Sequence, residues 1–504
     1  MRRRRLLAAV GGLGALGLAG GATLAARQST RGDPPSSPEP ATGRRPAGDR
    51  VPAGPPIPRD VQLPLPESAF ERGTARDAIP AIVEPAIAPD WAGLSVPVDD
   101  QFGRRTARPR LADGDAVIGV RVGDGGIDAG PEADDDHRPV ARAYPLRVLV
   151  HHEVVNDVVA GRPLAVTYCP LCASGLVADR RVPTEGAVPP TSGSAPETAT
   201  ADQSDAGTAT NDGAGPETAI ADGAGARRST TGAAPTRFGV SGLLWRDNLV
   251  LYDAATGSLW SQLLARAVRG PLTGTPLEPL PSTLTTWGRW RADHPGTDVL
   301  LPPPHSGTIA PMDVPRDYRL NPYAAYGDNR AVGFGEGGFA SQGTPAPFDD
   351  DRLHPKTQVL GVAHGGTARA YPYATVAGRD GPNGRAGLVH DRVGDLPVVV
   401  AAVADGLVAY DRRIDGRARR FVPVDGHERS GEGPAVDRHA GGPEGATTVR
   451  TARAAGSRWR LADGVAIDGP RRGTRLAPAT RHTTQFWFAW LSLYPETSVY
   501  GIDG

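Results

Sequence analysis

The chain has 504 residues, which is enough for about three domains of ordinary size and a sizeable hydrophobic core. Its 65 glycines and 50 prolines are about twice the usual share of these residues, which excludes a long helical bundle or a coiled coil. The charges of the 55 basic and 56 acidic residues nearly cancel, so we predict no nucleic-acid partner. Two cysteines are too few for a disulfide scaffold or a four-thiolate zinc site.

Residues 1–27 have the features of an export signal. Four arginines at positions 2–5 precede an uninterrupted apolar stretch at positions 6–26. Arg3 and Arg4, followed by two leucines after one residue, fit the twin-arginine pattern, which directs folded proteins across the membrane. We expect an extracytoplasmic protein, secreted or on the cell surface, that meets the membrane only through this signal if it stays uncleaved. Residues 28–66, rich in Pro, Ser and Gly, predict a tether.

Two parts of the remaining chain repeat each other. The phrase Val-Ile-Gly-Val, followed by Ala-Arg-Ala-Tyr-Pro, begins at Val117 and returns, with Leu for Ile, at Val359. Later matches in the same order pair three tryptophans with three others: Trp260 with Trp459, Trp287 with Trp487, and Trp290 with Trp490. Because chance seldom gives so many matches in one order, we predict two copies of one unit, at 67–305 and 312–504.

The fold class predicted for this unit is mainly β with minor α, internally duplicated. Short apolar runs separated by turn residues indicate strands, and three segments are candidates for short helices: Leu146–Val155, Thr286–Asp293 and Gln485–Leu493. Each copy is interrupted by a low-complexity insertion, at 182–235 and at about 415–455. Neither insertion has enough apolar residues to order itself, so we expect two disordered surface loops.

The chemistry is expected where the two copies differ. In the first copy an apolar strand leads directly into Cys169, Pro170, Leu171 and Cys172, whereas the second copy has Val403 at the place of the first thiol. We therefore predict one working site in the first copy and a degenerate second copy. Two thiols at this spacing form a disulfide, hold a soft metal such as copper or zinc, or share the protons of one nucleophilic thiolate.

A second group of polar residues lies just upstream of the cysteines. On a helix through Val155, His152 and Asn156 share one face, with Glu153 beside them, and the second copy has neither this histidine nor this glutamate. Three interpretations follow: a metal set of His152 with both cysteines, a Cys–His–Asn arrangement for nucleophilic catalysis, or side chains that only satisfy backbone groups of a capped helix.

Further polar residues of the first copy are expected to line the same site. They are Tyr168, Ser174, Ser241, Ser261 and Gln262. Ser241 or Ser261 would lie near an oxyanion if Cys169 attacked an acyl group. The paired tryptophans are assigned to the core because both copies have them. The single lysine of the chain, Lys356, belongs to no motif, and no role is assigned to it.

Several of these phrases together resemble a known family. Asp77-Ala-Ile-Pro-Ala-Ile82, His152-Glu-Val-Val-Asn-Asp157, Thr167-Tyr-Cys-Pro-Leu-Cys172, Phe238-Gly-Val-Ser-Gly242 and Ser258-Leu-Trp-Ser-Gln262 are similar to the prokaryotic family called domain of unknown function 3179 (DUF3179), from about Glu67 to the C-terminus. The resemblance implies an exported protein of no established activity. It also implies that the thiol at Cys169 matters more than the one at Cys172.

The leading hypothesis is a thiol site for redox chemistry or for soft-metal binding, with Cys169 as thiolate, Cys172 as partner, and His152 with Glu153 as ligand or proton carrier. One alternative is a hydrolase or acyl transferase with Cys169 as nucleophile, His152 as base and Asn156 as orienting group. Another is a binding module without catalysis outside the cytoplasm. The expected partner is a small molecule or a redox protein.

Overall fold

The structure is a computed structural model. It describes residues 56–100, 103–123, 139–183, 232–310, 316–324, 326–327, 330–333, 348–378, 387–403, 406–424, 428–429 and 447–503. All of them belong to the unit that begins at Val51. The predicted signal at 1–27, most of the predicted tether and most of the insertion at 182–235 lie outside the described residues.

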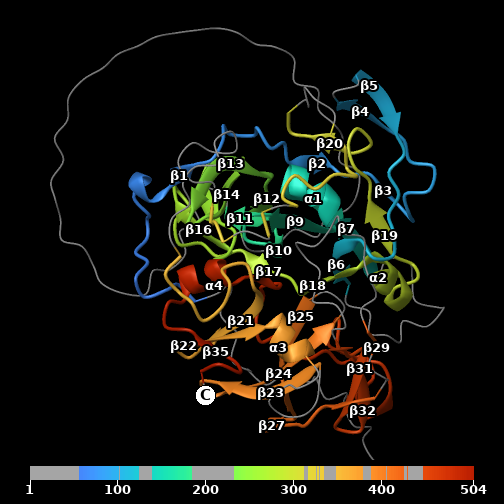
Figure 1. Cartoon of the computed structure of the whole chain (residues 1–504), viewed down its shortest axis with the longest axis vertical. Coiled ribbons are helices and arrows are strands. Elements are labelled where there is room, and N and C mark those ends of the chain that lie inside the picture. Colours follow the sequence, from blue (N-terminus) through green and yellow to red (C-terminus); the bar gives the residue numbers. More distant parts are fainter. Residues whose placement is uncertain are drawn as a thin grey trace, which may run out of the picture. The chain divides into compact units, whose positions relative to one another are not determined.

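The first copy forms three sheets (Figure 1). In spatial order, the first sheet holds β18 (Ser282–Thr286), β6 (Ala116–Val122), β7 (Val140–Pro145), β19 (Asp298–Leu300) and β3 (Ile87–Ala88). The second holds β17 (Glu278–Pro279), β10 (Ser174–Asp179), β9 (Arg162–Cys169), β8 (Val154–Val159), β2 (Ile82–Glu84) and β20 (Gly307–Thr308). The third holds β1 (Glu71–Arg72), β13 (Phe238–Trp245), β14 (Asn248–Asp253), β15 (Leu259–Ser261) and β16 (Arg266–Arg269).

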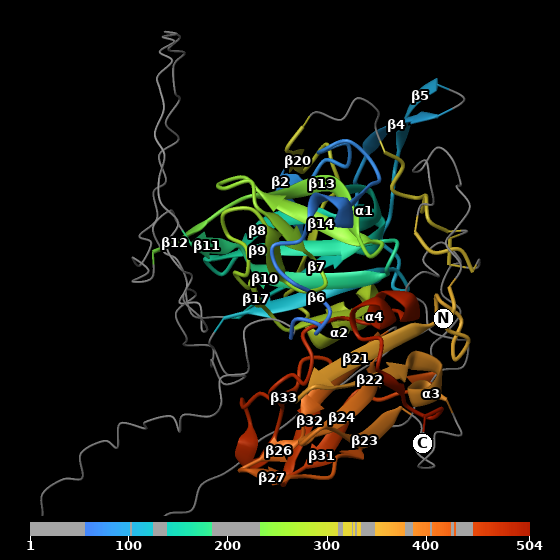
Figure 2. The same ribbon diagram turned by 90° about the vertical axis from the view of Figure 1, so that its left-hand side faces the viewer.

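The second copy forms the corresponding three sheets, coloured orange to red in Figure 2. They are β34 (Gln485–Phe486), β21 (Gln358–His364), β22 (Thr367–Pro372) and β35 (Ser498–Val499); then β23 (Leu388–Val393), β24 (Leu396–Val403) and β25 (Gly406–Asp411); then β28 (Val422–Pro423), β31 (Thr451–Ala454), β32 (Ser457–Arg460) and β33 (Val465–Ala466). The pairing also repeats, since β19 runs parallel to β7 as β35 runs parallel to β22. The six sheets are arranged like propeller blades, which confirms the duplicated, mainly β fold.

The remaining elements are small. Four two-stranded pairs are described: β4 (Val96–Asp100) with β5 (Gly103–Ala107), β11 (Arg181–Pro183) with β12 (Ala233–Pro235), β26 (Arg413–Ile414) with β27 (Arg417–Ala418), and β29 (Glu428–Arg429) with β30 (Thr447–Thr448). The helices are α1 (Leu146–His152), α2 (Trp287–Asp293), α3 (Tyr373–Ala377) and α4 (Trp487–Leu493), with short 3-10 turns η1 (Glu67–Ala69) and η5 (Gly469–Arg471). Within the described ranges, no helix has the length and hydropathy needed to cross a membrane.

Both insertions are flanked by ordered strands. Strands β11 and β12 pair across the first insertion, with Pro183 opposite Ala233. The second insertion was predicted too wide, because β27, β28, β30 and β31 all fall inside 415–455. These strands have few apolar residues of their own, and they are ordered by pairing and by packing on the neighbouring sheet, which local composition does not reveal.

The repeated Ala-Arg-Ala-Tyr-Pro phrase has a structural explanation. Arg142 Nη1 and the Tyr144 hydroxyl both donate to Asp157 Oδ2, each at 2.8 Å, and so connect β7 to β8 of the next sheet. In the second copy the repeated arginine and tyrosine donate to Asp391 in the same way, each at 2.9 Å. Because these groups are partly or fully buried, each ion pair with its tyrosine fixes the angle between two neighbouring sheets.

One pair of repeated tryptophans, Trp290 and Trp490, lies in the core against a glycine of β6 in the first copy and of β21 in the second. Trp290 is 2% exposed, and a Cβ added at Gly119 would lie 2.3 Å from its ring. Trp490 is 1% exposed and stands in the same relation to Gly361, at 2.1 Å. The glycines are therefore required by the close approach of an aromatic ring and not by a special backbone angle.

We predict that Gly119→Ala lowers the free energy of unfolding by about 1–3 kcal/mol, because the Trp290 ring must move in a filled core. Chemical denaturation measures the change. Gly296→Ala is the matched control, because a Cβ there has no atom within 4 Å. Equal stability of the two variants would contradict this account of the packing.

Candidate functional site

The helix before the cysteines is shorter than predicted. Helix α1 ends at His152, and Glu153 takes a left-handed conformation with a φ of 56° while its N–H donates to Leu149. Strand β8 follows immediately, in agreement with its four valines, which favour strands. The expectation that His152 and Asn156 share a helical face is therefore wrong, because one left-handed residue separates a helix from a strand.

Cys169 and Cys172 lie at the end of the hairpin formed by β9 and β10. Cys169 pairs with Ser174, so that the residues between them, 170–173, form the turn, and both thiols are free and buried. The sulfur of Cys169 accepts hydrogen bonds from the Cys172 thiol and from the backbone N–H groups of Leu249, Cys172 and Leu171. Burial raises the pKa of the Cys169 thiol, but these four donors outweigh it and lower the pKa below its usual value.

Cys172 has the opposite character. Burial, followed by its hydrogen bond to Cys169, raises the pKa of this thiol well above its usual value. The backbone oxygen of Asp247, 3.2 Å from the Cys172 Sγ, is a second acceptor for the single proton of this thiol. Asp247 belongs to the two-residue turn between β13 and β14, where Arg246 and Asp247 have φ values of 53° and 58°, as in a type I′ hairpin. The two thiols therefore differ strongly in acidity, although they are three residues apart.

Three buried amide and hydroxyl side chains hold the cysteine turn in place. The Ser174 hydroxyl donates to Gln262 Oε1 at 2.9 Å, and the Gln262 amide donates back to the Ser174 backbone oxygen at 2.9 Å. Asn248 Nδ2 donates to the same Gln262 oxygen at 3.0 Å. Ser174 and Gln262 were predicted to line the site, and the structure places them as supports of the turn, Ser174 at the start of β10 and Gln262 directly after β15 of the third sheet.

Glu153 lies beside Cys169 and is only 7% exposed. Burial raises the pKa of this carboxyl well above its usual value, and the charge of Cys169 raises it further. Its backbone oxygen accepts the N–H of Tyr168 at 2.8 Å, which fixes the end of β8 against the end of β9. The site thus holds an acidic thiol next to a carboxyl group that favours its neutral form.

Two tyrosines near the start of the second copy cover this site, and no sequence motif pointed to them. Tyr323 is 5% exposed and interacts electrostatically with Glu153 and Cys169. Tyr326 interacts in the same way with Cys172, and the Nζ atom of Lys356 lies 3.6 Å from the centre of its ring. Lys356 also donates to the Tyr326 backbone oxygen at 2.8 Å. Its being the single lysine of the chain was the only available signal.

The second copy completes the site. The N–H of Phe486 donates to the backbone oxygen of Cys172 at 2.8 Å. Thr483 Oγ1 accepts the N–H of Gly175 at 2.8 Å. These contacts hold the cysteine hairpin from β34 and the residues before it. The second copy therefore lacks thiols but is required for the position of those in the first.

His152 is turned away from the cysteines. Its Nδ1 lies 2.8 Å from the backbone oxygen of Pro80, and its Nε2 lies 2.9 Å from the Tyr318 hydroxyl. Both ring nitrogens are thus engaged, and burial lowers the pKa of His152 to about 3. The structure does not assemble the predicted metal set, and in the described ranges no group of three or more His, Cys, Asp and Glu side chains is suited to hold a metal ion.

The other candidates for a hydrolase site lie in backbone contacts. Asn156 joins β8 to β13 by donating to the Phe238 backbone oxygen at 2.8 Å and accepting its N–H at 2.7 Å. The Ser241 hydroxyl donates to Val250, and Ser261 accepts the N–H of Leu264. None of these contacts places an orienting amide or an oxyanion donor beside Cys169.

The fold and site define a propeller-like β protein with a buried pair of unlike thiols. The model of the family described as "Protein of unknown function (DUF3179)" matches residues 76–197 and 219–497. The chain therefore belongs to this family, as the sequence phrases indicated. No curated protein and no solved structure matches the chain.

We predict that Tyr323→Ala raises the rate at which iodoacetamide alkylates Cys169 by about tenfold, because it opens the cover of the thiol. Mass spectrometry of the native protein follows the reaction. Leu320→Ala is the control, because Leu320 belongs to the same segment and is 63% exposed. Equal rates in the wild type and in Tyr323→Ala would show that this tyrosine does not limit access.

A second prediction concerns His152. Its pKa is lowered in the folded state, so its contribution to stability is complete above the unfolded value of 6.5 and is lost as the pH falls through that value. Between about pH 6 and pH 5, the free energy of unfolding of the wild type should fall by about 1.4 kcal/mol per pH unit more than that of His152→Gln. Urea denaturation at both pH values measures the slopes, and equal slopes would contradict the burial of a neutral ring.

Proposed function

We propose that this protein exchanges thiols and disulfides, with Cys169 as the attacking thiolate and Cys172 as the resolving thiol. The observation that carries the proposal is the set of donors around the Cys169 sulfur, three backbone N–H groups and one thiol. A thiolate is the reactive form of cysteine, and a neighbouring thiol of higher pKa is suited to the second step of exchange. A cysteine whose only task was packing would not need four donors.

The exchange has two steps. The Cys169 thiolate attacks one sulfur of an external disulfide, the S–S bond breaks, and the leaving sulfur departs as a thiolate. The Cys172 thiol then attacks Cys169, an internal disulfide forms, and the second external sulfur leaves with the Cys172 proton. Two electrons pass from the protein dithiol to the external disulfide, which becomes one thiol and one thiolate before the thiolate is protonated.

Glu153 supplies a proton in this scheme. A neutral carboxyl beside the reacting sulfur protonates the first leaving thiolate and is reprotonated from water afterwards. The raised pKa of Glu153 and its position beside Cys169 support this role. Two negative charges side by side in a buried site repel each other. A charged Cys169 thiolate therefore favours a neutral, protonated Glu153.

The substrate class is a small disulfide outside the cytoplasm. The cover formed by Tyr323 and Tyr326 favours a compact disulfide over a folded protein. The predicted twin-arginine signal at 1–27 favours an exported protein, and disulfides persist outside the cytoplasm. No metal is part of the proposal.

The experiment treats the reduced protein with oxidised glutathione and measures intact mass. The mass of the wild type should fall by that of two hydrogen atoms, with no glutathione bound, because Cys172 resolves the mixed disulfide into an internal one. Cys172→Ser should keep one glutathione on Cys169, since its resolving thiol is absent. Cys169→Ser should react at least about tenfold more slowly, because the remaining thiol has a raised pKa.

Two results would refute the proposal. One is a wild type that keeps both thiols across the whole range of glutathione potentials. The other is equal reactivity of Cys169→Ser and Cys172→Ser, which would remove the assigned difference between the thiols. Glu153→Gln keeps the size of the side chain, and it should slow release of the first thiol while leaving the midpoint potential nearly unchanged.

A further inference from the structure

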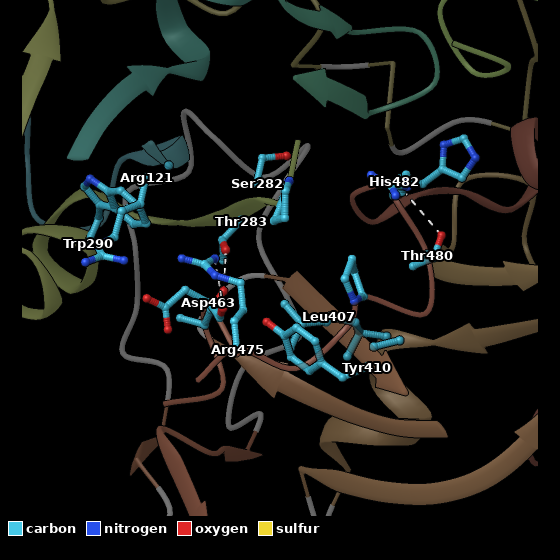
Figure 3. A pocket seen from close by; sticks show the side chains of 17 residues that line it. Arg121, Ser282, Thr283, Trp290, Leu407, Tyr410, Asp463, Arg475, Thr480 and His482 are labelled. Carbon is cyan, nitrogen blue, oxygen red and sulfur yellow. Dashed lines mark hydrogen bonds between the residues drawn. The ribbon is translucent and has the colours of Figure 1, made fainter. Parts of the chain in front are cut away.

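A pocket whose lining includes neither cysteine lies at the junction of the two copies (Figure 3). Strands β6 and β18 and helix α2 of the first copy form one wall, and β25 with residues 462–463 and 475–482 forms the other. The cavity volume is about 40 Å³. This is room for about three waters, or for a group as small as a phosphate or a carboxylate.

The lining of the pocket carries excess positive charge. Three arginines line it, Arg121, Arg475 and Arg481, and Asp463 is the single acidic residue in the lining. Arg460 forms a further ion pair with Asp463, with Nε 3.0 Å from Oδ1. Arg121 is about half-buried and is repelled by Arg475 and Arg460, while it is attracted by Asp463. Asp463 therefore attracts three guanidinium groups, of which Arg460 is also attracted by Asp293 outside the lining. Arg481 adds a fourth cation, which Glu278 attracts from outside the lining.

Two polar side-chain atoms in the same lining have no hydrogen-bond partner within the described residues. The Nε2 atom of His482 and the Nε atom of Arg481 are both buried without a hydrogen-bond partner in that part of the chain. Burial lowers the pKa of His482 to about 4, so its ring is neutral at neutral pH. Buried donors without partners are uncommon in folded proteins, and a ligand with acceptor oxygens would satisfy them.

The duplication supplies an internal comparison. At the corresponding positions of the other copy, Arg121 is replaced by Ala363, Asp463 by Leu264 and Arg475 by Pro276. The backbone is the same at both places, since Arg475 bridges to Val465 as Pro276 bridges to Arg266. The fold therefore does not need these charges, and they belong to this junction alone.

We propose that this pocket binds a small ligand through an oxyanion group, a phosphate or a carboxylate. Arg121 and Arg475 hold the oxyanion from opposite copies, because guanidinium groups match such oxygens with paired hydrogen bonds. Arg481 and His482 contribute further donors from the side of the second copy.

The test is titration calorimetry of the full chain with inorganic phosphate and, separately, with succinate, in chloride buffer of constant ionic strength. The wild type should bind at least one of the two anions at one site. The anion that binds more tightly shows whether the pocket prefers a phosphate or a carboxylate. Arg475→Gln should lower the association constant at least about tenfold, because it removes a charge-assisted hydrogen bond. The exposed Arg417 gives the matched control, Arg417→Gln, which should bind as the wild type does.

Thermal unfolding without added anion separates binding from a structural role. Removing a surplus cation should leave the melting temperature of Arg475→Gln unchanged or higher, whereas a purely structural arginine would lower it. Arg121→Gln repeats both measurements from the first copy if Arg475→Gln fails to fold. Equal binding by wild type and variants, or no saturable binding of either anion, would overturn the proposal.

Discussion

A buried thiol has a lowered pKa only where hydrogen-bond donors replace water around its sulfur, and this constraint connects the described parts of the chain around Cys169. The donors come from the cysteine turn itself and from Leu249, which belongs to a different sheet. Their positions depend on the hydrogen bonds among Ser174, Asn248 and Gln262. The sheets are held at fixed angles in turn by buried ion pairs such as Arg142 with Asp157.

The two copies contribute different residues to the thiol site and to the junction pocket. Both have kept the strands, the paired tryptophans and the ion pair between the first two sheets, which are the parts a propeller-like fold needs. Only the first has thiols, and the second contributes Phe486 and Thr483 to the cysteine hairpin. The second copy also contributes Asp463 and Arg475 to the junction pocket, where the first copy has leucine and proline at the corresponding positions. Divergence after duplication thus changed different places in each copy.

Sequence patterns predicted the parts that depend on local signals. The duplication, the strand leading into Cys169 and helices α2 and α4 within two residues all followed from repeats and hydrophobic spacing. The end of α1 did not, because a single left-handed residue, Glu153, replaced a helical turn by a strand. With the helix shortened, the expected grouping of His152 with Asn156 was lost.

The other parts of the site depend on contacts between distant residues. Tyr323 and Phe486 lie more than a hundred residues from the cysteines and belong to no motif near them. Asp247 contacts Cys172 through its backbone oxygen, whose position depends on the geometry of the turn. The identity of the side chain therefore does not predict this contact. Such contacts are set by the way sheets pack, so that one sequence without a structure does not reveal them.

The ladder between β11 and β12 has a practical consequence. Pro183 and Ala233 face each other across two antiparallel strands, so their Cα atoms are about 5 Å apart. A compact reporter domain whose ends lie close together can replace the residues between them without pulling on either strand. Because β11 continues from β10, whose other end carries the cysteine turn, a fluorophore placed there would report on the hairpin from outside the site.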